Sequence, residues 1–230
     1  MKIIVFDTET SGLPKSKIIT HTTIHLWPFI VQFSYIIFDT DTNTIIKSYD
    51  AIVKVKPYNI ISEDSIKFHG ITQEISELKG INIDNVLAEF IGDLEHADMI
   101  VAHNIEFDLN MIRVEVLRLE QSLIAQGNME LRMINVELRM TLLIQTKNFY
   151  CTMRESVDLC KIEKENSRGK YYKFPTLTEL HKHLFDVEPK HLHNSFHDIL
   201  CTTRCFIKIK YNQDIVEQNP QFKDLIQKLI

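Results

Sequence analysis

Two acidic side chains lie two positions apart at the end of an apolar run near the N-terminus. The segment IIVFDTETSG, residues 3–12, carries Asp7 and Glu9 directly after its apolar residues. Alternate residues of a β-strand share a face, so these two carboxylates point the same way if the strand persists, while Ile4 and Phe6 fill the other face. Carboxylates this close repel each other and need cations or shared protons. A buried strand ending in a polar loop would have the same sequence, so the pattern alone leaves both interpretations open.

A third acid, Asp108, follows another short apolar run over residues 98–103. Asn104 is a favourable N-cap residue and would fix the first turn of the helix expected after that strand. Asp108 would then lie near the carboxyl edge of the sheet. The helix dipole also favours an acid in a first turn, so Asp108 in isolation does not indicate function.

A histidine and a fourth acid occur together in HLHNSFHDIL, residues 191–200. Asn194 can cap the helix that follows, with Asp198 one turn in and His193 in the preceding loop. An imidazole on a loop beside a carboxylate suits a general base near a metal site. His197 is the alternative base, but adjacent helical residues diverge by about 100°. We therefore expect His197 to point elsewhere and favour His193.

Alternating strands and helices would position these groups. Hydrophobic periodicity and cap residues predict a hairpin turning at residues 39–43, a short helix after Ser62, and a last helix near the C-terminus. Strands are expected over 2–7, 29–38, 44–55, 98–103 and 148–153, and further helices over 84–97, 109–123, 129–145, 176–185 and 194–210.

The middle of the chain has two amphipathic stripes. Apolar residues recur at a spacing of three and four, which is typical of a helix with one packed face. We expect residues 1–230 to form a single domain, with a helical elaboration at about 113–147 that contacts substrate, a protein partner or a second protomer. The stripes are Leu109, Ile112, Val116, Leu119 and Leu123, and then Met133, Val136, Met140 and Leu143.

Three segments, FDTET, HNIEFD and HNSFHD, occur in the order and approximate spacing of the motifs of the DEDDh exonucleases. That superfamily includes the proofreading subunit of bacterial DNA polymerase III, and the resemblance extends from residue 2 to about 207. It implies a ribonuclease-H-like α/β fold, a five-stranded mixed sheet flanked by helices. Ser195 stands where the family usually has alanine.

The resemblance implies a metal-dependent 3′→5′ exonuclease that releases nucleoside 5′-monophosphates from DNA or RNA with a free 3′ end. Two Mg²⁺ or Mn²⁺ ions would suit oxygen-only ligands better than zinc, activate water and stabilise the leaving oxygen. Carried over by motif, His193 would be the general base. The metal-binding acids would be Asp7, Glu9, Asp108 and Asp198.

Further residues have two interpretations each. Thr10, Leu13 and Phe107 are predicted to contact the terminal nucleotides by the same resemblance, although Phe107 could equally be core. Residues 161–173 carry five basic residues and two acids together with Tyr171 and Tyr172. They either follow a nucleic-acid backbone or form a solvated loop.

Histidines and cysteines gather near the C-terminus, but their spacing matches no common zinc module, so surface and core roles are favoured. They are His181, His183, His191, His193, His197, Cys201 and Cys205.

The composition fits a globular enzyme. The chain of 230 residues is 44% hydrophobic and 25% charged, with a net charge of −5. This charge argues against nonspecific adhesion to nucleic acid, but not against an enzyme whose acids are neutralised by metal ions. The N-terminal apolar run is too short for a signal peptide, no stretch approaches a membrane span, and the four cysteines indicate no disulfide framework. An intracellular location, cytoplasmic or nuclear, is the expectation.

Two alternatives to an exonuclease have the same fold. One is a catalytically silent nucleic-acid-binding or scaffold protein, against which the presence of all four acids and the histidine argues. The other is an enzyme that cuts internally or acts on small nucleotides, which depends on the shape of the pocket. The choice between DNA and RNA depends on contacts to a 2′-hydroxyl.

Overall fold

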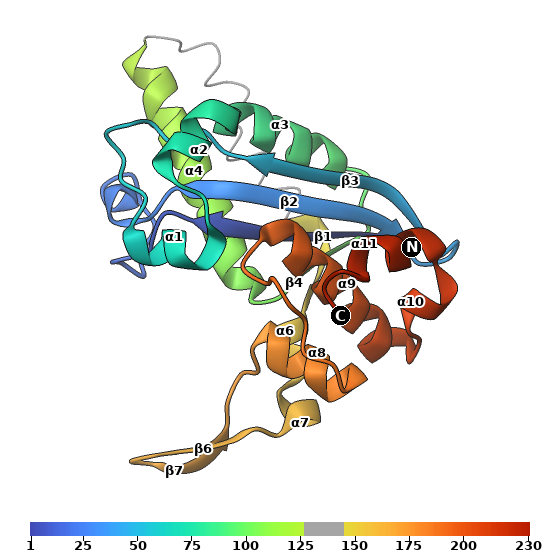
Figure 1. Ribbon diagram of the computed structural model, residues 1–230. Coiled ribbons are helices and arrows are strands. Elements are labelled where there is room, and N and C mark those ends of the chain that lie inside the picture. Colours follow the sequence, from blue (N-terminus) through green and yellow to red (C-terminus); the bar gives the residue numbers. More distant parts are fainter. Residues whose placement is uncertain (127–144) are drawn as a thin grey trace.

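The computed structural model describes residues 1–126 and 145–230 and has a five-stranded mixed sheet in the order β3-β2-β1-β4-β5 (Figure 1). β1, β2 and β3 are antiparallel neighbours, whereas β4 and β5 run parallel to β1. The predicted five-stranded α/β fold is confirmed. The strands are β1 Lys2–Thr10, β2 Ile30–Asp39, β3 Thr44–Ile52, β4 Met99–Ala102 and β5 Asn148–Cys151.

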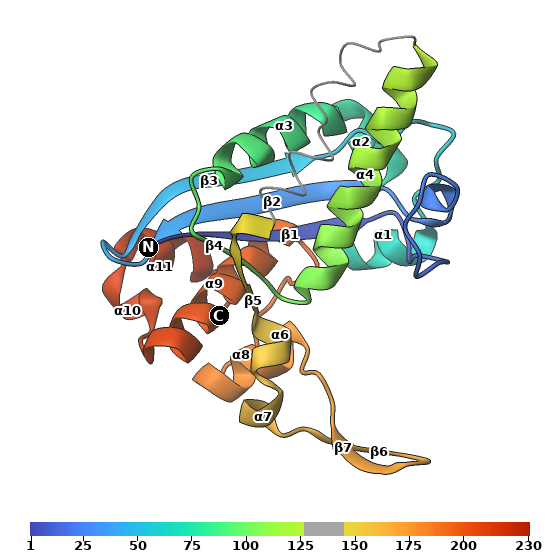
Figure 2. The same ribbon diagram turned by 180° about the vertical axis from the view of Figure 1, so that it is seen from behind.

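Helices form a layer on each face of the sheet. Figures 1 and 2 show α3 and α4 over one face and α8, α9, α10 and α11 over the other. The helices are α1 Glu63–His69, α2 Gln73–Lys79, α3 Ile83–Leu94, α4 Ile105–Ala125, α6 Thr152–Glu155, α7 Val157–Cys160, α8 Leu177–Phe185, α9 Ser195–Tyr211, α10 Ile215–Gln218 and α11 Pro220–Ile226, with a short 3₁₀ helix, η1, at Ile24–Leu26.

The central strand β1 is buried on both faces. Ile4 and Phe6 lie in the core cluster shared with α3 and α4, while Ile3 and Val5 lie in the cluster shared with α8, α9 and α11. A strand covered on both sides has no solvent face, so its sequence is a continuous apolar run. The first polar side chains after that run are therefore held firmly at the carboxyl end of the strand.

Cap residues set several helix boundaries as expected. The Ser62 side chain accepts a hydrogen bond from the N–H of Ser65 at the start of α1, and Gly70 ends the helix in the left-handed region with φ 73°. At the start of α9, the Asn194 side chain accepts from the N–H of His197. The predicted cap of the helix that carries Asp198 is confirmed.

The helix α2 was not predicted because its anchor is polar. Its buried residue is Ser76, whose hydroxyl donates to the carbonyl of Val53 and accepts from the N–H of Val55. Gly80 ends this helix where a Cβ would come within 2.6 Å of the backbone nitrogen of Lys54. A short helix with one buried serine and one partly buried apolar residue, Ile75, has no apolar stripe that its sequence could show.

Residues 163–172 form a hairpin in which every residue is exposed, rather than a simple loop. Its strands are β6 Glu163–Asn166 and β7 Gly169–Tyr172, and it projects away from the sheet and its helices (Figures 1 and 2). With no buried face, the hairpin has no alternation of apolar and polar residues.

The first amphipathic stripe lies on α4, which confirms the helix expected over residues 109–123. The helix expected over 129–145, and most of the elaboration expected at 113–147, lie outside the described residues. In the two described ranges, no helix combines the length and the apolar character that crossing a membrane requires.

Candidate active site

The carboxyl end of β1 and the first turn of α9 bring three acids together. β1 continues to Thr10, so Asp7 and Glu9 both lie on the strand and share a face. Asp198 lies in the first turn of α9, which packs against that face. One ligand oxygen from each of these three side chains lies within 4.8 Å of the other two.

Contacts between α9 and β2 fix this approach. The hydroxyls of Ser195 and Ser34 are 2.6 Å apart, and the N–H of Ser195 donates to Oε1 of Gln32 at 3.2 Å. Ser34 and Gln32 are the β2 partners of Asp7 and Glu9 in the sheet. The serine that replaces the family's usual alanine therefore ties the start of α9 to the strand beside the acids.

Asp108 is held on the other side of the strand end. It is 2% exposed, in the first turn of α4, and its Oδ1 accepts the backbone N–H of Thr8 at 3.1 Å and the Thr8 hydroxyl at 2.7 Å. It lies outside the group of three converging carboxylates, although its charge acts on Asp7 and Glu9.

The predicted cap at Asn104 is wrong in its chemistry. Asn104 occupies the N-cap position of α4, but it has φ 71° and ψ 45°, and its side chain makes no capping hydrogen bond. A residue in the left-handed region does not have the extended backbone of a side-chain cap. Thr8, rather than Asn104, ties the first turn of α4 to the end of β1.

Burial raises the pKa values of all four acids and is the main cause at each. Repulsion from neighbouring carboxylates adds to it at Glu9, at Asp108 and most strongly at Asp7, whose pKa lies well above its usual range. The pKa of Glu9 is raised to about 8 and those of Asp108 and Asp198 to about 7. Hydrogen bonds from Thr8 partly offset the effect at Asp108.

A divalent cation fits this site. Oδ1 of Asp198 is buried and has no hydrogen-bond partner within the described residues. A buried acceptor without a partner is unfavourable, and a cation beside three converging carboxylates would satisfy it. The donors are all carboxylate oxygens, which suit Mg²⁺ or Mn²⁺.

The structure places His193, and not His197, beside the acids. The N–H of His193 donates to Oδ2 of Asp198 at 3.2 Å, and its ring meets the ring of Phe68 edge-on at a centroid distance of 5.2 Å. The His197 ring instead bonds through Nδ1 to the carbonyl oxygen of His191 at 2.8 Å. His193 lines the same pocket as Asp7, and His197 does not.

That pocket has a volume of about 510 Å³. Asp7, Glu9 and Asp198 line it together with His193 and with residues 174–178 at the start of α8, whereas Asp108 does not line it. The lining residues are Asp7, Thr8, Glu9, His103, Asn104, Met153, Phe174, Pro175, Thr176, Leu177, Thr178, Leu192, His193 and Asp198.

His103 is a pocket residue that the sequence analysis missed. Its ring nitrogens lie 3.0 Å from the Thr152 hydroxyl and 3.2 Å from the carbonyl oxygen of Pro175. Burial lowers its pKa to about 4, so the ring is neutral at physiological pH. Through these contacts His103 joins the end of β4 to α6 and to Pro175, which lines the pocket. The sequence did contain a signal for it, because His103 directly follows the apolar run that forms β4, the strand paired with β1.

The three residues predicted to contact the terminal nucleotides do not line the pocket. Leu13 is 81% exposed, Phe107 packs against the core, and the Thr10 hydroxyl donates to the carbonyl of Gly12 at 2.8 Å. Their substrate contacts remain predictions.

His181 is a structural residue. Its Nδ1 bonds to the carbonyl oxygen of Val187 at 2.8 Å, and its Nε2 lies 3.0 Å from Nη1 of Arg204. Both ring nitrogens are thus engaged by protein groups. In residues 1–126 and 145–230, Asp7, Glu9 and Asp198 form the one group of three or more candidate metal ligands.

Comparisons with known proteins agree with this geometry. The family model described as Exonuclease (RNase_T) matches residues 4–206, a range that includes all four acids and His193. No curated protein sequence matches the chain.

Solved structures of Escherichia coli exonuclease I share the fold. Its complex with a dT13 oligonucleotide has a TM-score of 0.59 at 16% identity, over 92% of this chain and 42% of that chain. Its complex with a dA16 oligonucleotide has a TM-score of 0.59 at 17% identity, over 97% and 42%. The present chain thus spans less than half the length of those proteins. The match over residues 4–206 shows that the chain belongs to the exonuclease family of the DEDDh 3′→5′ exonuclease superfamily, and it has the ribonuclease-H-like fold.

Proposed function

We propose that this nuclease is a metal-dependent 3′→5′ exonuclease that releases nucleoside 5′-monophosphates. One observation carries the proposal: the carboxylates of Asp7, Glu9 and Asp198 converge within 4.8 Å, in a pocket that His193 also lines. Acids with raised pKa values in a concave site are typical of functional groups rather than structural ones.

The four acids would hold two divalent ions. Asp7, Glu9 and Asp198 offer oxygens that lie close together, and Asp108, whose Oδ1 accepts two hydrogen bonds from Thr8, would complete the set. Such ions, when bound, activate water and compensate the charge on the phosphoryl oxygens. The protein keeps these oxygens in place through β1, α9 and the Thr8–Asp108 hydrogen bonds.

His193 would accept the proton of the attacking water. Its backbone is held by the bond to Asp198 and its ring contacts the ring of Phe68, and within the described residues no hydrogen bond engages a ring nitrogen. A ring nitrogen is therefore available to a water in the pocket, as a general base requires.

The pocket supports cleavage at a chain end. A volume of about 510 Å³ is within the range of sites for single small ligands, so one terminal nucleotide is a suitable occupant. An internal phosphodiester would require the strand to continue on both sides of the scissile bond. The direction, 3′ to 5′, follows the superfamily.

A labelled-substrate assay tests the proposal. Purified protein is incubated with 5′-labelled and 3′-labelled single- and double-stranded DNA and RNA, in Mg²⁺, Mn²⁺ or EDTA. We expect 5′-labelled strands to shorten stepwise, 3′-labelled strands to release a labelled mononucleotide at once, and EDTA to stop both. Glu9→Gln is the inactive control. Discrete internal products, or no hydrolysis in either metal, would contradict the proposal.

A further inference from the structure

The two faces of the β6–β7 hairpin have different chemistry. Cross-strand partners in an antiparallel pair lie on the same face, and the faces alternate along each strand. Lys164 therefore shares a face with its partner Tyr171, together with the pair Asn166–Gly169, and this face has no acid. The opposite face has the pairs Glu163–Tyr172 and Glu165–Lys170.

Their charges are engaged differently. On the acidic face, Nζ of Lys170 forms an ion pair with Glu163 at 3.2 Å. On the other face, no ion pair or hydrogen bond engages Nζ of Lys164 in the part of the chain that the structure describes. The ring of Tyr171 lies beside it and the residue is 46% exposed. A free cation next to an exposed aromatic ring suits a nucleic-acid strand, because the cation meets phosphate and the ring stacks on a base.

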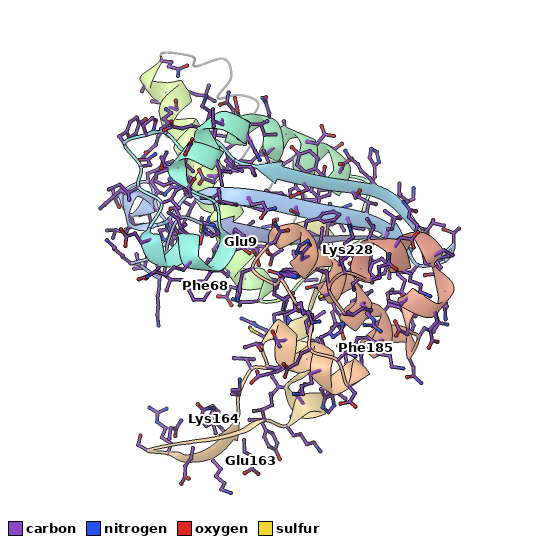
Figure 3. The ribbon with its side chains drawn as sticks, in the orientation of Figure 1. Glu9, Phe68, Glu163, Lys164, Phe185 and Lys228 are labelled. Atoms are coloured by element: carbon purple, nitrogen blue, oxygen red, sulfur yellow. The ribbon has the colours of Figure 1, made fainter. Side chains whose placement is uncertain are left out.

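The Lys164 face is turned toward the body of the protein. Figure 3 shows Lys164 on the side of the hairpin that faces Phe68 and α1, and Glu163 on the opposite side. Phe68 also contacts the ring of His193, which lines the pocket, so this side of the hairpin faces the part of the protein that carries the candidate active site.

The hairpin is joined directly to the pocket wall. β7 ends at Tyr172, and the chain then reaches Phe174 and Pro175, which line the pocket. Tyr171 lies three residues before Phe174, and an extended chain spans about 3.5 Å per residue, so the two are at most about 10 Å apart along the backbone. A strand with its end in the pocket would reach the hairpin within a few nucleotides.

We infer that the Lys164–Tyr171 face of the hairpin binds a single nucleic-acid strand a few nucleotides from the end that occupies the pocket. The inference rests on the proposed exonuclease function for the direction of the strand. Tyr171 stacks on an unpaired base and Lys164 contacts a phosphate. Bases within a duplex are already stacked on each other, so the substrate at this position is single-stranded.

Binding measured in EDTA tests the inference without any hydrolysis. The probe is a 5′-fluorescein single-stranded oligonucleotide of about 16 nucleotides, as DNA and as RNA, followed by fluorescence anisotropy. Tyr171→Ala is expected to raise Kd about fivefold or more, the low end for loss of one base–aromatic stack, while Tyr171→Phe keeps the wild-type Kd. Lys164→Ala is expected to reduce the slope of log Kd against log salt by about 0.7, the value for one phosphate contact to a single strand.

Matched controls lie on the opposite face. Lys170→Ala removes the same charge and Tyr172→Ala the same ring, and both are expected to leave Kd and the salt slope within twofold of wild type. A duplex probe, or a dinucleotide that fills only the pocket, is expected to bind wild type and Tyr171→Ala alike, since neither offers an unpaired base at the hairpin.

Equal effects of Lys164→Ala and Lys170→Ala, or no effect of Tyr171→Ala, would overturn the inference, as would failure of the wild type to bind either strand. The outcome is separable from that of the proposed function. Hairpin-dependent binding by a protein that hydrolyses nothing would support the inference and refute the exonuclease. Stepwise hydrolysis with a Kd unchanged in Tyr171→Ala would do the reverse.

Discussion

Helix α9 contributes to two clusters of buried charged residues, one in which like charges face one another and one in which opposite charges are paired. The carboxylate site consists of Asp7, Glu9, Asp108 and Asp198. In it, acids face one another and Oδ1 of Asp198 has no partner among the described residues. The Arg204 cluster lies about two turns further along the same helix and consists of His181, Arg204 and Asp214.

In the Arg204 cluster every charge is paired. Arg204 donates from Nε and Nη2 to the two carboxylate oxygens of Asp214 at 2.9 and 2.6 Å, and its Nη1 meets His181. Burial alone would raise the pKa of Asp214, but the bonds from Arg204 hold it below its usual value. The comparison separates two uses of buried charge: a paired cluster joins α8, α9 and α10, whereas a cluster with unresolved repulsion is ready to bind cations.

The largest effect is expected from Asp7→Asn. Because Asp7 lies among the other acids, losing its charge should remove the site's hold on the metal. We expect the rate of hydrolysis to fall more than about 10⁴-fold, above the range for one general acid or base. Single-turnover assays on a labelled oligonucleotide measure this. Near-normal activity of this variant would refute the assignment of the carboxylate site to catalysis.

His193 and His197, which lie on either side of the start of α9, should differ in their effect on the rate of hydrolysis. His193→Ala is expected to lower the rate about 10²- to 10⁴-fold, as for loss of a general base, while Mn²⁺ binding measured by calorimetry is kept. His197→Ala is the matched control and should leave the rate within a few-fold of wild type. If His197→Ala alone lost activity, the base would have to be reassigned.

Replacement of an aspartate by asparagine should have opposite effects on the free energy of unfolding in the two clusters. Asp214→Asn leaves Arg204 without its counter-charge, and we expect a loss of about 3 kcal/mol in the free energy of unfolding. Asp7→Asn in EDTA relieves repulsion and is expected to gain about 1 kcal/mol, or roughly 2–4 °C in Tm. Urea unfolding of both variants beside wild type provides the test. Destabilisation by both would erase the contrast between the clusters.

The last prediction is a pH dependence of stability in the absence of metal. The pKa values of Glu9, Asp108 and Asp198 are raised on folding to about 8, 7 and 7, so the folded state binds more protons than the unfolded state between about pH 4 and 8. Stability in EDTA should therefore fall as pH rises through this window. Thermal scans at pH 5.5 and about pH 8 measure the change, and Mg²⁺ should restore the lost Tm at the higher pH. A Tm that rises with pH in EDTA would show that these acids do not dominate the titration.

Much of the site could be predicted from sequence because its signals are short-range. The alternation along β1 placed Asp7 and Glu9 on one face, and Asn194 marked the start of the helix that carries Asp198. These features depend on backbone periodicity and on hydrogen bonds within a few residues. The α/β fold followed from the same local patterns together with the order of the motifs.

The missed elements lack such patterns. The buried residue of helix α2 is a serine, and the hairpin of residues 163–172 has no core face at all. Asn104 shows the converse error, since a residue type that favours caps adopted a left-handed backbone instead.

The sequence by itself determined which groups we propose for the chemistry: four carboxylates and a histidine, at spacings that one strand and two helix starts can present. Tertiary structure alone decided how they are held. Thr8 bonds to Asp108 across 100 residues, and His103 reaches Pro175 across 72. Such contacts depend on the register of β4 against β1 and on how the helices pack on the sheet. Residues this far apart in the chain meet only after the core has formed, so no local pattern encodes their pairing.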